Sequence, residues 1–98
     1  MTRLSFGLAL QYLQQGKKVA RLGWNGKGMW LLLVSANEYY INKVGFLPKN
    51  EHDHDWRKRV PQTLPWIGMK TADNCFVPWL ASQSDILAED WLVVEDAT

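Results

Sequence analysis

The chain has 98 residues and a formal net charge of +1, and 47% of its residues are hydrophobic while 21% are charged. This composition is that of a folded globular domain and excludes disorder for most of the chain. A chain of this length buries roughly 65% of its unfolded surface, which is enough for one core. We therefore expect a single domain over residues 1–98.

The longest apolar run, Met29–Val34, is far shorter than the roughly 20 residues that a membrane-spanning helix needs. No small-residue cleavage site follows the short apolar stretch near the N-terminus, so we expect no signal peptide. A single cysteine, Cys75, excludes an internal disulfide and fits a reducing cytoplasm. These observations predict a cytoplasmic protein without a membrane anchor.

Two features of the composition are unusual. The chain holds six tryptophans, which is a large excess for 98 residues. Residues 1–70 hold all 11 basic residues and 4 acidic ones, whereas residues 71–98 hold 6 acidic residues and no basic one. Either the two halves interleave and neutralise each other within one domain, or a basic face meets an anion.

The first third of the chain predicts a helix and a hairpin. Apolar residues recur with helical spacing after the candidate N-cap Ser5, which predicts a helix over 5–15. Alternation predicts a strand over 18–22, and the apolar run over 29–35 predicts a buried central strand. Asn25-Gly26 between them is a strong hairpin signal.

Residues 36–63 show no lasting periodicity and predict a long variable loop region, with a short strand around Tyr39–Val44. The elements expected after it are a second hairpin around Asp73-Asn74, a short helical turn that Ser82 and Asp85 cap, and a last strand. The two strands of the hairpin are expected over Pro65–Thr71 and Cys75–Leu80, and Pro78 makes the second an edge strand or the site of a bulge. The helical turn is expected over Ser84–Ala88 and the last strand over Trp91–Glu95. The fold class predicted is α+β, a small single domain with an antiparallel sheet.

Catalytic and metal-binding patterns are weak. The two histidines, His52 and His54, lie in a charged stretch without a buried orienting partner, and no nucleophile turn or phosphate-binding glycine motif is present. Glu51–Asp55 has metal-ligand residue types, but no second ligand pair appears elsewhere. Cys75 is expected to be a small structural residue. We therefore expect no enzyme, no metal and no cofactor.

The glycine-rich connection between the first two strands is a candidate binding site. An indole, an amide, two cations and exposed backbone N–H groups are the parts that stack a base, bind its edge or ribose and neutralise a phosphate. A hairpin turn with Trp24 folded back on the core is an equally good interpretation. The residues are Arg21, Gly23, Trp24, Asn25, Gly26, Lys27 and Gly28.

A second candidate surface is the predicted turn that contains Lys70, Thr71, Ala72 and Asp73, followed by Trp79. It again brings an aromatic ring near a cation, a hydroxyl and a carboxylate. A turn with a packed tryptophan is the simpler interpretation and is slightly favoured when this surface is considered alone.

Three other tryptophans are expected in the core or at an interface. Trp30, Trp66 and Trp91 fall in predicted strands, and a domain of this size can hardly cover six indoles from its own chain. We therefore expect self-association or a ligand that covers some of them. Trp56–Arg59 forms a local basic patch, but the chain lacks the broad basic excess that duplex binding needs, so neither DNA nor RNA is expected as a partner.

Several long motifs resemble a family of small phage and prophage proteins, the second class of Thoeris anti-defence proteins. The resemblance covers nearly the whole chain except about 36–63. The matching strings are Phe6-Gly7-x-Ala9-Leu10, Gly16–Met29 around W-N-G-K-G, Pro65–Asn74 (P-W-x-G-M-K-T-A-D-N), Phe76–Gln83 and Leu87–Trp91.

The resemblance implies a non-enzymatic sponge. Such proteins bind and sequester the cyclic ADP-ribose isomer that the TIR enzyme of the Thoeris defence system makes, so that the effector is not activated. It also implies a homotetramer with ligand pockets where subunits meet, acting in the cytoplasm of the infected bacterial host. A sponge needs no nucleophile or general base.

Carried over by position, the resemblance implies roles for individual side chains. Trp24 and Trp79 would stack on the adenine, and Asn25, Thr71 and Asp73 would hydrogen-bond to base or ribose. Arg21, Lys27 and Lys70 would contact the pyrophosphate. Gly26 and Ala72 complete the set of expected ligand-binding residues.

Two alternatives stay open. The chain could capture cyclic di- or trinucleotides of other signalling defences, or it could be a protein-interaction module that blocks an effector directly.

Overall fold

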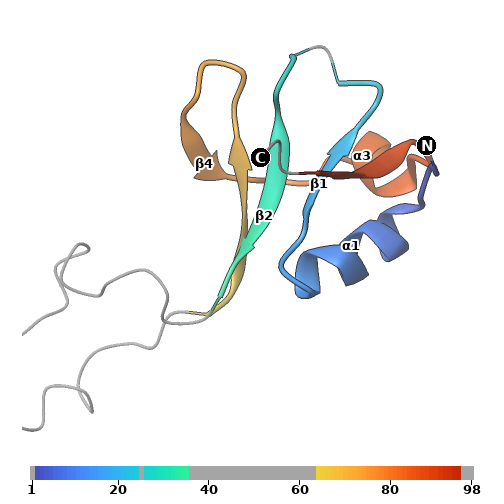
Figure 1. Ribbon diagram of the computed structural model, residues 1–98, viewed down its shortest axis with the longest axis horizontal. Coiled ribbons are helices and arrows are strands. Elements are labelled where there is room, and N and C mark those ends of the chain that lie inside the picture. Colours follow the sequence, from blue (N-terminus) through green and yellow to red (C-terminus); the bar gives the residue numbers. More distant parts are fainter. Residues whose placement is uncertain (1, 25, 36–63, 96–98) are drawn as a thin grey trace, which may run out of the picture. The chain divides into compact units, whose positions relative to one another are not determined.

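The computed structural model describes residues 2–24, 26–35 and 64–95 and confirms the α+β class (Figure 1). Its elements are α1 (Phe6–Gln14), β1 (Lys18–Arg21), β2 (Trp30–Val34), β3 (Trp66–Lys70), β4 (Phe76–Pro78), α3 (Gln83–Leu87) and β5 (Trp91–Val94). Each expected helix and strand among these residues is confirmed, with bounds that differ by at most two residues.

Backbone contacts divide the chain into one unit of Met1–Leu33 with Ile67–Thr98 and a second unit of Val34–Trp66. The long loop region expected over 36–63, with its strand around Tyr39–Val44, lies outside the described residues. The single domain over residues 1–98 stays a prediction.

Helix α1 begins as its sequence predicts. The Ser5 hydroxyl accepts a hydrogen bond from the backbone N–H of Leu8 at 3.3 Å, which satisfies one of the unpaired donors of the first turn. Ala9 and Leu13 are the buried residues of the helix and lie one turn apart. The helix therefore presents one apolar stripe to the sheet, and Figure 1 shows it beside β1.

The five strands form one sheet in the order β4-β3-β2-β1-β5. Strand β1 pairs antiparallel with β2 and also with β5, where Arg21 lies opposite Trp91 and Lys18 opposite Val94. Strand β2 is the central strand, as predicted, but of its residues only Leu31 is buried, because the face that carries Trp30 is partly open. Strand β4 is an edge strand, as Pro78 indicates. The pairing of β1 with β5 brings the acidic C-terminal segment next to the basic N-terminal half.

The core is small and centres on Trp91. Its fully buried members are Ala9, Leu13, Val19, Leu31 and Trp91, each 0% exposed. The indole of Trp91 packs against the aromatic rings of Phe6, Trp24 and Trp79, whose centroids lie 5.4, 5.4 and 6.0 Å away. The expectation that Trp91 is a core residue is confirmed.

Trp30 and Trp66 are half-buried. Because neighbouring strand residues point to opposite faces, Trp30 lies on the face of β2 opposite to buried Leu31. There its ring lies 6.3 Å from that of Phe76, and the Lys18 ammonium lies 4.5 Å from the Trp30 ring centroid. This face of the sheet therefore carries aromatic rings and a cation that α1 does not cover.

Candidate functional site

The two candidate surfaces of the sequence meet at one end of the sheet. Figure 1 shows the β1–β2 connection and the β3–β4 turn side by side at that end. The Lys70 ammonium donates a hydrogen bond to the backbone carbonyl of Gly28 at 2.9 Å. A Cβ atom on Gly26 would lie 3.1 Å from that of Ala72. Residues more than forty positions apart therefore form a single surface within one chain.

Two glycines make this approach possible. Gly28 has a φ of +74°, a left-handed conformation that side chains other than glycine rarely adopt. At Gly26 a Cβ atom would also overlap the side chain of Met29. Any larger residue at Gly26 therefore forces Met29 or the β3–β4 turn to move.

The β3–β4 turn is fixed by its own polar groups. The Thr71 hydroxyl donates to the Asp73 carboxylate and accepts from the backbone N–H of Cys75 at 3.0 Å. Asn74 has a φ of +67°, which fits a type I turn closed by a left-handed residue. The hydrogen bond from Thr71 holds the pKa of Asp73 below its usual value. Thr71 and Asp73 thus present a charged, hydrogen-bonded pair near the exposed tip.

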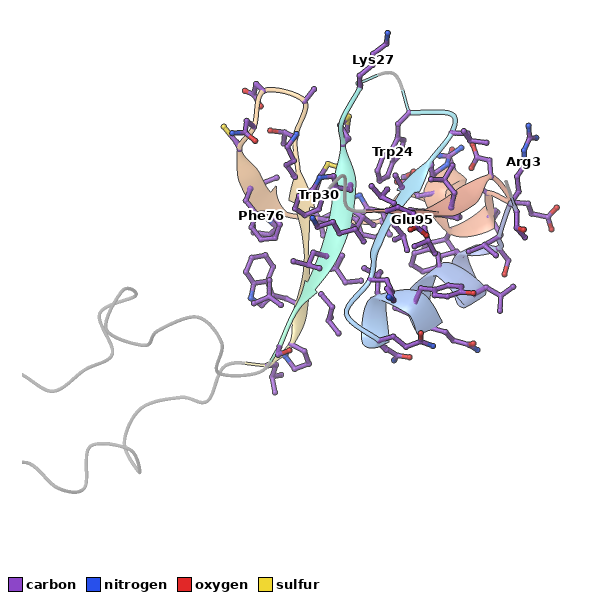
Figure 2. All side chains as sticks on the ribbon, viewed as in Figure 1. Arg3, Trp24, Lys27, Trp30, Phe76 and Glu95 are labelled. Atoms are coloured by element: carbon purple, nitrogen blue, oxygen red, sulfur yellow. The ribbon has the colours of Figure 1, made fainter. Side chains whose placement is uncertain are left out.

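The cations at this end differ in their surroundings. Figure 2 shows Lys27 extending from the β1–β2 connection away from the ribbon, and the residue is exposed. Lys70 is half-buried, and its ammonium donates to the carbonyls of Gly28 and Thr71, at 2.9 and 3.4 Å, rather than to a carboxylate. Asn25 lies outside the described residues, so its predicted contact stays a prediction.

The surroundings of Trp24 agree with both interpretations that the sequence left open, namely packing on the core and exposure to a ligand. Its ring packs edge-to-face on Trp91, with centroids 5.4 Å apart and planes at 80°. Its indole Nε1–H donates to the Asp85 carboxylate at 3.3 Å. The residue is half-buried, so the indole is held against the core and keeps part of its surface at the solvent. Its stacking role stays a prediction.

Trp79 packs on the same central indole. Its ring lies 6.0 Å from Trp91 at 86° and 6.0 Å from Phe6. Its backbone N–H donates to the carbonyl of Ile67, which continues the strand pairing beyond β4. Trp24 and Trp79, which are 55 positions apart in the chain, therefore share Trp91 as a neighbour, and both remain half-buried.

Arg21 lies in an ion-pair network. Its Nη1–H donates to Asp85 at 2.8 Å and its Nε–H to Asp90 at 2.9 Å. The guanidinium side chain is 19% exposed, and the two carboxylate side chains are 13% and 24% exposed. The hydrogen bonds that Arg21 donates to Asp90 and then to Asp85 raise the pKa of Arg21 above its usual value. The structure thus places its Nε and Nη1 on protein carboxylates, and its predicted contact with a pyrophosphate stays a prediction.

Asp85 and Asp90 belong to this region although the sequence analysis did not single them out as site residues. Asp90 also accepts from the backbone N–H of Gly23 at 2.8 Å, which ties it to the β1–β2 connection. Its pKa is held down chiefly by the hydrogen bond from Arg21. The capping pattern predicted a role for Asp85 in α3, and that cap is confirmed. No local pattern predicts the contacts with Arg21, because the partners are more than sixty positions apart.

An open cavity of about 1030 Å³ lies elsewhere, along the edge of β5 and the C-terminal end of α1. Of the candidate residues that the structure describes, none lines it. Within residues 2–24, 26–35 and 64–95, no group of His, Cys, Asp and Glu could hold a metal ion. In the same part of the chain, no helix has the length and apolar character needed to cross a membrane.

The arrangement contains two groups of side chains. Lys27, Lys70, Thr71 and Asp73 belong to the β1–β2 connection and the β3–β4 turn, which meet at one end of the sheet, and the half-buried indoles of Trp24 and Trp79 pack on Trp91. These groups can hold an aromatic base, hydroxyl groups and phosphates.

Known proteins share this sequence pattern over almost its whole length. A family model described as "Tad2-like: Thoeris anti-defense 2-like domain" matches residues 4–94. The chain is 43% identical over 93 residues to the protein "Thoeris anti-defense 2" of Bacillus phage SP01, a match that covers 95% of this chain and 97% of that protein. The matched region includes every candidate residue as well as Asp85 and Asp90.

Proposed function

Because the chain belongs to the Thoeris anti-defence 2-like family, we propose that it binds and sequesters a cyclic ADP-ribose isomer, the product of the Thoeris TIR enzyme. Capture without degradation would keep the signal from the effector in the cytoplasm of the infected host. In this proposal the protein is a sponge and not an enzyme, and it needs neither metal nor cofactor.

The observation that supports this proposal best is the junction of the β1–β2 connection with the β3–β4 turn. The Lys70 ammonium joins the two segments through Gly28, and Gly26 lies against Ala72. A ligand at this end meets cations, hydroxyls and backbone donors from both segments at once. Contacts from both segments at once would favour the tight binding that sequestration needs.

We assign the roles of the side chains by their chemistry. Trp24 and Trp79 would stack on the adenine, and Thr71, Asp73 and Asn25 would hydrogen-bond to base or ribose. Lys27 and Lys70 would contact the pyrophosphate. Arg21 would reach a phosphate through Nη2, because its Nε and Nη1 donate to Asp90 and Asp85.

We also propose that the protein works as a homotetramer with its ligand pockets between subunits. Large apolar side chains on this chain lie in solvent, among them Leu80 at 92% and Leu87 at 76% exposed. Leu80 directly follows Trp79, so a subunit that covers Leu80 would lie beside one of the proposed stacking residues. Contact between subunits would bury such side chains and complete a pocket that one chain leaves open.

The test is a native mass titration with two ligand classes, the cyclic ADP-ribose isomer and cyclic di- or trinucleotides, alone and in competition. The proposal predicts a tetramer that gains a fixed number of cyclic ADP-ribose molecules. Binding of cyclic oligonucleotides alone would overturn the choice of ligand. A protein that binds no nucleotide but co-purifies with an effector would favour the protein-interaction module.

A further inference from the structure

Asp85 connects four parts of the molecule through one side chain and one carbonyl. Its Oδ1 accepts from Arg21 Nη1 at 2.8 Å and from Trp24 Nε1 at 3.3 Å. Its Oδ2 accepts from the Ser82 backbone N–H at 3.2 Å and from the Ser82 hydroxyl at 2.9 Å. Its backbone carbonyl accepts from Trp91 Nε1 at 2.9 Å. Both indoles of the Trp24–Trp91 pair therefore donate to the same residue.

The Asp85 carboxylate is a fixed and charged acceptor. Its side chain is 13% exposed. Burial raises its pKa, but hydrogen bonds from Arg21, Ser82 and Trp24 outweigh burial and hold the pKa below its usual value. The group is therefore ionised at neutral pH, and the capping box fixes it on α3. An acceptor held in this way restricts the indole that donates to it.

Two independent constraints act on Trp24. The edge-to-face contact with Trp91, at 5.4 Å and 80°, restricts the tilt of the ring. The hydrogen bond from Nε1 to Asp85 restricts rotation about the bond that joins the ring to Cβ. Together they leave one orientation of the indole and hence one orientation of its solvent-facing part.

We infer that Asp85 is a positioning residue that presents the Trp24 indole to the ligand, an inference that rests on the proposed function for its binding role. Asp85 itself needs no contact with the nucleotide. Because Asp85 holds Trp24 in place before the ligand arrives, binding does not have to order the indole, and the loss of side-chain conformational entropy on binding is smaller. The ion pair with Arg21 and the hydrogen bond from the Ser82 backbone N–H, which Ser82→Ala keeps, serve this role by fixing the carboxylate.

The chain offers two matched controls. Asp90 pairs with the same guanidinium and its side chain is also partly buried, but its other carboxylate oxygen accepts from the backbone N–H of Gly23 and not from Trp24. Ser82 caps α3 through Asp85, and Ser82→Ala removes the hydroxyl while leaving the Oδ1 contacts in place. Asp90→Asn therefore reports the loss of an Arg21 carboxylate partner, and Ser82→Ala reports the loss of the cap.

The first measurement needs no ligand. In ¹⁵N-labelled full-length protein, Asp85→Ala, which removes the acceptor, should shift the Trp24 indole N–H resonance and speed its exchange with solvent at least fivefold. The Trp91 indole N–H, which donates to the backbone carbonyl of residue 85, should stay protected. Asp90→Asn and Ser82→Ala should leave the Trp24 resonance within the wild-type range. Unchanged exchange of Trp24 in Asp85→Ala would overturn the inference.

The second measurement is a double-mutant cycle on binding of the cyclic ADP-ribose isomer. Trp24→Phe keeps a ring but removes the donor. Asp85→Ala should weaken binding about tenfold in the wild-type background and less than twofold in Trp24→Phe, because the two residues act through one hydrogen bond. Ser82→Ala should stay within threefold of wild type. Equal losses in both backgrounds would show that Asp85 does not act through Trp24.

The two measurements separate the inference from the function on which it rests. If the wild-type protein binds no such nucleotide while the indole exchange responds as expected, the proposed function fails and Asp85 still orients Trp24. If the nucleotide binds tightly and neither the exchange nor the cycle responds, the function stands and the positioning role is wrong.

Discussion

Arg21→Lys tests whether the guanidinium fork, and not charge alone, stabilises this fold. In the structure the fork spans two carboxylates on different segments, with Nη1 on Asp85 at 2.8 Å and Nε on Asp90 at 2.9 Å. A lysine keeps the charge, but its single ammonium ends near the position of the guanidinium carbon and cannot reproduce both contacts. We therefore expect the loss of one charge-assisted hydrogen bond.

The expected loss of unfolding free energy follows from how far the three charged side chains are exposed. A hydrogen bond to a charged group contributes about 1.5–3 kcal/mol, and the partial exposure of all three side chains places this one near the lower end, at about 1.5–2 kcal/mol. For a chain of this length the melting temperature should fall by about 6–16 °C. Urea and thermal unfolding of Arg21→Lys and wild type measure the difference.

The control is Arg3→Lys, since Arg3 is exposed and Figure 2 shows its side chain extending away from the ribbon. Its unfolding free energy should stay within about 0.5 kcal/mol of wild type. An equally stable Arg21→Lys would refute the reasoning. If that variant also lost nucleotide affinity, Arg21 would serve the ligand and not the fold.

Three further predictions follow from the same contacts. Trp24→Ala should lower nucleotide affinity at least 100-fold while the far-ultraviolet circular dichroism stays that of a folded protein, and unchanged affinity would remove Trp24 from the site. Gly26→Ala should destabilise the fold in urea by about 1 kcal/mol, because its Cβ would lie 3.1 Å from that of Ala72 and would displace the Met29 side chain, whereas a neutral effect would mean that the two segments are not in close contact. Folding lowers the pKa values of Asp85 and Asp90. Both carboxylates therefore stabilise the folded protein at a pH above the pKa of an unfolded Asp, about 3.9, and this stabilisation is lost as the pH falls below that value. Unfolding measured from pH 7 to 2.5 should show that loss in wild type and a smaller one in Asp90→Asn.

Local sequence patterns predicted most of the elements correctly. The helical spacing after Ser5 and the capping pair Ser82 and Asp85 each depend on contacts within a few residues, and both are confirmed. Asp73-Asn74 predicted the turn because Asn tolerates the left-handed conformation that Asn74 adopts.

The two predicted hairpins correctly pair β1 with β2 and β3 with β4, but the sequence could not predict that β2 lies beside β3 or that β5 lies beside β1. Strand β5 lies beside β1 because Trp91 is the residue about which α1, Trp24 and Trp79 pack, and this packing joins the two ends of the chain. The same long-range pairing explains part of the charge split. Arg21 from the basic half and two of the acidic residues of the last segment form one network inside the molecule.

For the candidate site too, the sequence could not predict contacts between distant segments. Residue types suggested two binding surfaces, and nothing in either string indicates that Lys70 reaches the carbonyl of Gly28. For Trp24, the sequence left a choice between ligand stacking and packing on the core. The structure shows an indole that is packed on one side and half-buried overall, which is compatible with both.

The most direct test of sequestration is recovery of the signal. The protein in molar excess is incubated with a known amount of the cyclic ADP-ribose isomer and filtered to remove free nucleotide, and the retained fraction is heated and analysed by mass. The proposal predicts that nearly all of the nucleotide is retained with the protein and then released intact. Nucleotide that passes the filter unbound, or that is recovered as a cleaved product, would contradict it.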